Sequence, residues 1–97
     1  MNINNTEIKL KQTFRALILF EEITGESFTG KGMKEILIYF YSVILANNPE
    51  FNMPFDEFID YLDEHNDLLT EFLEWLNKLN ERNKITPTEE SDGVKKN

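Results

Sequence analysis

The sequence predicts a mainly α-helical protein, a small four-helix domain with a short N-terminal strand and a disordered C-terminal tail. Apolar residues recur at helical spacing from Thr13 to Leu79, and residues that start or end helices separate the apolar stretches. A chain of 97 residues normally forms one domain around a single core. We expect the helical domain to span residues 1–82 and a flexible polar tail to occupy residues 83–97.

The first expected element is a strand between Asn4 and Lys11. In this segment polar residues alternate with Ile8 and Leu10, which is typical of a half-buried strand. No clear second strand is present to pair with it.

The first helix is expected to begin near Thr13, a good N-cap, and to end at Gly25, which can adopt the left-handed conformation. Its apolar residues fall on two faces, so we expect it to pack against more than one neighbour. One face holds Ala16, Leu19, Phe20 and Ile23, and the other holds Phe14 and Ile18. Residues 27–32 form a link from which Phe28 is expected to fold back onto the core.

The second helix is expected over Met33–Ala46 and contains an apolar run whose single polar residue is Ser42. This run is too short to span a membrane and too apolar for a surface helix, so something must cover it. The expected core stripe is Met33, Ile36, Leu37, Phe40, Val43 and Ile44. A second apolar face remains, formed by Ile38, Tyr41 and Leu45 and flanked by Tyr39.

The third helix is expected from Pro54 to Glu64, with acidic residues in its first turn that complement the helix dipole. The fourth is expected to begin near Asn66 or Asp67. Residues expected in the core are Phe55, Phe58, Ile59 and Leu62 in the third helix, and Leu68, Leu69, Phe72, Leu76 and Leu79 in the fourth, with Leu73 and Trp75 at the margins.

Net charge and composition limit the classes of partner that we expect for this protein. The formal charge is −8, and residues 51–97 hold five basic and twelve acidic residues. Such an acidic half repels phosphate, so we expect no nucleic-acid partner and no membrane partner. Cysteine is absent, which excludes disulfides and leaves the redox compartment undetermined. Because residues 1–12 lack a secretory signal pattern, we expect a cytoplasmic protein by default.

No motif in the chain predicts catalysis, a cofactor or a metal site. An EF-hand would need a central Gly, and none occurs between Phe51 and Asn80. His65 is the one histidine, and Glu21 and Glu22, as helix neighbours, point in different directions. The sequence therefore predicts a binding or assembly protein and no enzyme.

The segment from Thr13 to Phe28 resembles the opening helix of the tail assembly chaperones of long-tailed bacteriophages. The order of the elements from Glu7 to Asn80 is also similar to that family. An apolar helix, an Asn-Pro break, an acidic amphipathic helix and a Leu-rich helix follow one another. The residues that carry most of the resemblance are Thr13, Phe14, Arg15, Ala16, Leu17, Glu21, Glu22, Thr24 and Gly25.

This resemblance implies a protein of the infected host's cytoplasm that is absent from the finished virion. Its implied partners are the tape measure protein, whose helices it coats, and the tail tube subunits that it helps to recruit. No catalysis or cofactor is implied. The chain departs from the family in the consecutive aromatic residues Tyr39, Phe40 and Tyr41.

The partner-binding residues expected from the leftover apolar face are Ile38, Tyr41 and Leu45, with Tyr39 and Trp75 as additions. Apolar faces of this kind fit self-association equally well, so the sequence leaves a homo-oligomer open. The alternative function is an acidic inhibitor or antitoxin-like protein that masks a basic surface. Its contact face would be Asp56, Asp60, Asp63 and Glu64, and its binding would weaken steeply with salt.

Overall fold

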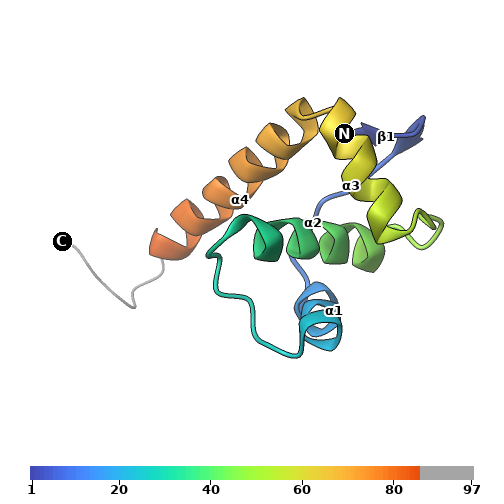
Figure 1. The fold of residues 1–97 in the computed structure, drawn as a ribbon. Coiled ribbons are helices and arrows are strands. Elements are labelled where there is room, and N and C mark those ends of the chain that lie inside the picture. The colour runs from blue at the N-terminus through green and yellow to red at the C-terminus, as the bar shows by residue number, and fades with distance from the viewer. Residues whose placement is uncertain (86–97) are drawn as a thin grey trace. The chain divides into compact units, whose positions relative to one another are not determined.

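The structure is a computed structural model that describes residues 1–85, and it describes side chains for residues 1–80. Within this range the chain forms four helices and a two-stranded sheet, which confirms the predicted fold class (Figure 1). The elements are β1 (Asn2–Ile3), β2 (Thr6–Glu7), α1 (Phe14–Thr24), α2 (Met33–Asn47), α3 (Phe55–Glu64) and α4 (Asp67–Ile85). The chain divides into two compact units, Met1–Glu64 and the part from His65 onward.

The N-terminal strand belongs to a hairpin that is shifted from its predicted position. β1 and β2 pair antiparallel, and Asn4 and Asn5 form the turn with φ values of 54° and 67°. Positive φ at both turn residues is the geometry of a type I′ hairpin, which Asn tolerates well. Ile8 is buried as expected, and its N–H donates a 2.7 Å hydrogen bond to the carbonyl of Met1.

Two asparagines at the end of α2 hold the chain that follows the hairpin. The amide oxygen of Asn48 accepts from the N–H of Lys9 at 2.9 Å, and its NH2 group donates to the Lys9 carbonyl at 3.0 Å. The NH2 group of Asn47 donates to the Lys11 carbonyl at 2.8 Å. These bonds connect residues almost forty positions apart, so the asparagines that end α2 also position the start of α1.

α1 begins and ends where the sequence predicts. The hydroxyl of Thr13 accepts a 3.1 Å hydrogen bond from the N–H of Ala16, which caps the first turn. Gly25 ends the helix at φ 78°, and its N–H donates to the carbonyl of Glu21 at 2.7 Å. Because both caps are local, they fix the helix bounds independently of tertiary packing.

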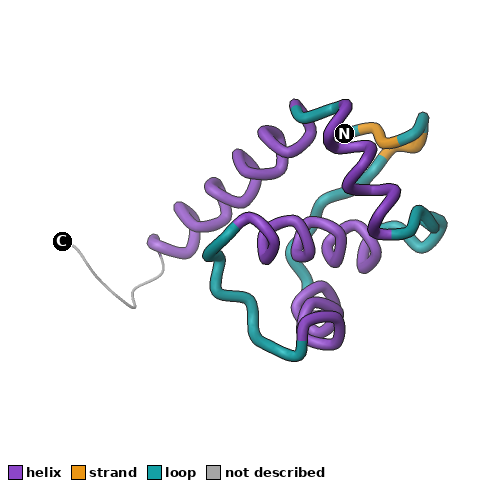
Figure 2. The backbone as a smooth tube through the Cα atoms, viewed as in Figure 1, coloured by secondary structure: helices purple, strands orange, loops and turns teal. Residues whose placement is uncertain are grey.

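The core of the first unit lies where α1 and α3 meet α2, and the axes of α1 and α2 cross (Figures 1 and 2). Ala16 and Phe20 of α1 are buried, and the ring of Phe40 packs edge-on against Phe58 at 5.1 Å. The buried part of α2 starts at Ile38, so Met33, which we expected in the core, is instead 52% exposed. The fully buried Ser42 donates its hydroxyl hydrogen to the Ile38 carbonyl at 2.8 Å.

The second unit consists, in the described range, of α4. Its Phe72 and Trp75 rings stack with centroids 5.4 Å apart, and Leu68 and Phe72 are its buried side chains. Residues 83–85 continue α4, and residues 86–97 of the expected tail lie outside the described range. None of the described helices combines the length and the apolar character that crossing a membrane requires.

Candidate interaction surface

Two of the residues that we expected to contact a partner are buried. Tyr39 is 1% exposed and Ile38 is 8% exposed. The ring of Phe28, from the link between α1 and α2, stacks on Tyr39 with centroids 4.1 Å apart, and Phe20 meets Tyr39 edge-on at 6.2 Å. The prediction of an exposed contact at Ile38 and Tyr39 is therefore wrong in this conformation, because the link and α1 already cover them.

Tyr41 and Leu45 are half-buried and also belong to the first unit's own packing. The Tyr41 hydroxyl donates a 2.7 Å hydrogen bond to the carbonyl of Met53, and desolvation raises the pKa of the phenol. Three aromatic rings surround it at centroid distances of 5.2 to 6.2 Å: Phe51, Phe55 and Phe58. Trp75, in the second unit, is half-buried and stacks on Phe72. The four expected residues of the first unit thus do not present one open apolar face.

The most exposed apolar side chains of the first unit lie instead on α1. Phe14 is 85% exposed and Ile18 is 54% exposed. These two residues are four positions apart and so are neighbours on one side of the helix. We call the side formed by Phe14, Ile18 and the exposed charged residues Arg15, Glu21 and Glu22 the outer face of α1.

Eight of the nine residues behind the family resemblance divide into two groups, and the ninth, Leu17, is half-buried. Thr13 and Gly25 cap α1, Ala16 is fully buried, and the Thr24 hydroxyl bonds the Phe20 carbonyl at 2.9 Å. These residues build the helix. Four others have exposed side chains that make no hydrogen bond, ion pair or ring contact within the described part of the chain: Phe14, Arg15, Glu21 and Glu22.

The charges on the outer face oppose the dipole of α1. The helix has no acidic residue in its first turn and no basic residue in its last turn. Arg15 instead lies at the positive N-terminal end, and Glu21 and Glu22 lie at the negative C-terminal end. Each such charge costs roughly 0.3 to 1 kcal/mol in an exposed helix. These charges therefore do not stabilise α1 in the free protein.

An indentation of about 480 Å³ lies between the end of α1 and the start of α2. Phe20, Ile23 and Ile38 supply its apolar lining, and Lys31 and Lys34 also line it. The small exposed part of Ile38 is therefore in this indentation, away from the outer face of α1.

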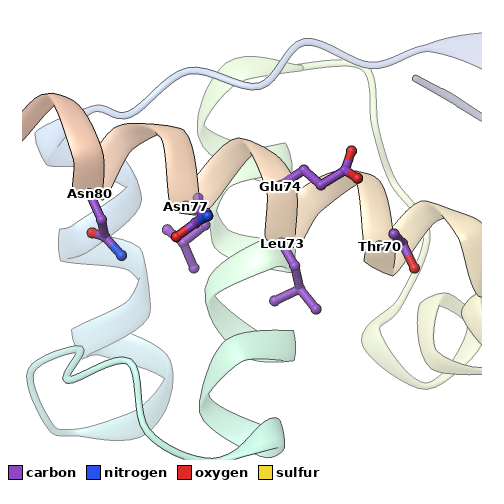
Figure 3. A pocket seen from close by; sticks show the side chains of 6 residues that line it. Thr70, Leu73, Glu74, Asn77 and Asn80 are labelled. Atoms are coloured by element: carbon purple, nitrogen blue, oxygen red, sulfur yellow. The ribbon is translucent and has the colours of Figure 1, made fainter.

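A second hollow, of about 450 Å³, runs along α4 (Figure 3). Leu73 and Asn80 project from the same side of the helix there, and Thr70, Glu74 and Asn77 also line it. Leu73, which is exposed, and Leu76, which is half-buried, supply its apolar lining.

The acidic face that the alternative function requires is present on α3. Asp56, Asp60, Asp63 and Glu64 are all exposed. Near them a shallow hollow of about 300 Å³ is lined by Met53 and Tyr61, whose hydroxyl accepts a hydrogen bond from the N–H of Asn4 at 2.9 Å. None of the large exposed apolar residues of the described chain lies on α3.

The described residues contain no group of three His, Cys, Asp or Glu side chains that could hold a metal ion. Comparison with protein-family models, with curated proteins and with solved structures finds no match to this chain.

Proposed function

We propose that this protein is a non-enzymatic tail assembly chaperone of a long-tailed phage. It shields an apolar stripe of the tape measure protein in the host cytoplasm and helps to recruit tail tube subunits. The observation that carries the proposal is the outer face of α1, where Phe14 and Ile18 are exposed within the segment that resembles the family. An exposed apolar pair on a helix suits helix-against-helix packing.

The size of this surface favours reversible binding. Complete burial of a Phe or Ile side chain stabilises a complex by about 2 kcal/mol, and association itself costs several kcal/mol. One copy would therefore hold a helix reversibly, and less tightly than a larger interface does. Many copies side by side along a long helical protein would protect it together and could still be displaced as the tail tube assembles.

A co-purification experiment tests the proposal. The chain is co-expressed with a helical segment of the tape measure protein encoded beside it, as wild type and as the variants Phe14→Asp and Met33→Asp. Met33 is the matched control, because it is exposed and apolar but lies on α2. We expect Phe14→Asp to abolish co-purification, Met33→Asp to retain it, and both variants to keep the helical far-UV CD spectrum.

The proposal is wrong if wild type does not retain the segment, or if Phe14→Asp retains it as well as wild type does. Equal loss in both variants would also contradict it, because a general effect of added charge would then explain the result.

The second candidate is an acidic protein that masks a basic partner, and the exposed carboxylates of α3 favour it. The variant Asp60→Asn with Glu64→Gln separates the two functions. Under the masking function this variant and added salt each weaken binding steeply, because screening acts on exposed charges. Under the chaperone function the α3 variant binds as wild type does.

A further inference from the structure

The charges on the outer face of α1 are distributed unevenly, with the cation near the N-terminal end of the helix and the carboxylates near its C-terminal end. Glu21 and Glu22 follow Ile18 by three and four positions, so they lie one turn beyond it on the helix surface. Arg15 is next to Phe14 at the other end. Along the helix axis the face therefore presents Phe14 and the cation Arg15 in the first turn, then Ile18, and then the pair of carboxylates near its C-terminal end.

Nothing in the described chain compensates the charges on this face. The side chains of Arg15, Glu21 and Glu22 have no partner in the described residues, and each lies at the end of α1 where its own charge is unfavourable. Charged residues that destabilise their own helix are expected at functional surfaces, where opposite charges of a partner offset the cost.

We propose that the outer face of α1 docks an amphipathic helix whose apolar residues cover Phe14 and Ile18. Lysine or arginine residues of that helix, one turn beyond its apolar residues, pair with Glu21 and Glu22. This inference rests on the proposed function, because it specifies the helix that the chaperone shields. A cation opposite the carboxylates also complements the negative end of α1.

The acidic pair at the end of α3 can be compared with the acidic pair at the end of α1. Asp63 and Glu64 are an exposed acidic pair in the last turn of a helix, as Glu21 and Glu22 are. No large exposed apolar side chain lies on α3 in the described structure. A basic partner helix that needs apolar contacts as well as charge pairing is therefore expected to bind α1 and not α3.

Two synthetic peptides of 18 residues test the inference with the full chain. Both carry the same Leu stripe at helical spacing, and they differ only one turn beyond it, where one has two Lys and the other has two Glu. We expect wild type to bind the Lys peptide at least tenfold more tightly than the Glu peptide. The double variant Glu21→Lys with Glu22→Lys should reverse this preference.

The control is the double variant Asp63→Lys with Glu64→Lys, which changes the net charge equally. Both double variants should raise the melting temperature, because each places cations at a helix C-terminus. Only the α1 variant should reverse the peptide preference. The inference is overturned if both variants change the preference equally, since net charge alone would then explain it, or if wild type does not distinguish the peptides.

The tape measure segment separates this inference from the proposed function. If Phe14→Asp abolishes co-purification but the α1 charge variant leaves it unchanged, the chaperone function stands and the basic-helix inference fails. If neither variant affects co-purification, both fail.

Discussion

Phe14 and Phe20 occupy the same helix and have opposite environments. Phe14 is 85% exposed and Phe20 is 1% exposed. We expect Phe20→Ala to lower the free energy of unfolding by about 3 to 5 kcal/mol, as for a buried Phe. Phe14→Ala should change it by no more than about 0.5 kcal/mol, as for an exposed residue. Urea unfolding of both variants measures the difference, and a large loss for Phe14→Ala would mean that its ring is covered in the protein.

The carboxylate of Glu35 organises the link before α2. It accepts hydrogen bonds from the N–H groups of Thr29, Gly30 and Lys31 at 3.0, 2.6 and 3.0 Å, and from the Thr29 hydroxyl at 2.8 Å. Desolvation raises the pKa of this carboxyl, but the hydrogen bonds from the Thr29 side chain and from the three N–H groups outweigh it. The pKa of Glu35 therefore lies below its ordinary value of 4.5.

This lowered pKa predicts acid sensitivity of the link. A carboxyl whose pKa is lower in the folded state than in the unfolded state stabilises the folded state at pH values above the unfolded pKa. This stabilisation is lost as the pH falls through the folded pKa. We therefore expect hydrogen exchange at the amides of residues 29–31 to be slow at pH 6 and, after correction for intrinsic rates, to lose protection below pH 4.5. Glu35→Gln is the control. If its amides lose protection over the same pH range, Glu35 is not the cause.

Aromatic residues show which residue environments the sequence could predict. We expected Phe28 to fold back onto the core, and it does, stacking on Tyr39. The same contact buries Tyr39, which we had placed in the partner-binding face. Helical phase assigns each residue to a side of α2, but it does not reveal that the link covers one side and the loop with Phe51 and Met53 another.

At the scale of single elements, the two caps of α1 support a stability prediction. Thr13→Ala removes the hydroxyl that accepts the Ala16 N–H and should cost about 1 kcal/mol. Gly25→Ala places a side chain at φ 78° and should cost about 1 to 2 kcal/mol from backbone strain alone, since an added Cβ would meet no atom within 4 Å. Urea unfolding checks both values. No loss for Gly25→Ala would contradict the left-handed cap.

The bounds of α1 could be predicted because Thr13 and Gly25 act on their own helix. The hairpin was harder to predict from the sequence, because each of its strands contributes only two paired residues on either side of the Asn4–Asn5 turn. α2 was predicted to end at Ala46, and in the structure Asn47 is its last residue and Asn48 is its C-cap. Their hydrogen bonds to Lys9 and Lys11 join segments distant in sequence, so no local pattern indicates them.

For the whole molecule, the sequence predicted an uncovered apolar face but placed it on the wrong helix. The apolar run of α2 looked too rich in large residues to be covered, yet α1, the link and α3 cover much of it. Phe14 and Ile18 were correctly separated from the main face of α1, and we expected a second neighbour to pack there. Within the described chain that neighbour is absent, and Phe14 and Ile18 are exposed.

Backbone amide NMR of the full chain, titrated with a helical segment of the tape measure protein, shows whether the outer face of α1 binds this partner. We expect the largest chemical-shift changes between Phe14 and Glu22, with little change at Asp56–Glu64 of α3. Changes centred on α3, with residues 14–22 unaffected, would contradict the claim that the outer face of α1 holds the partner.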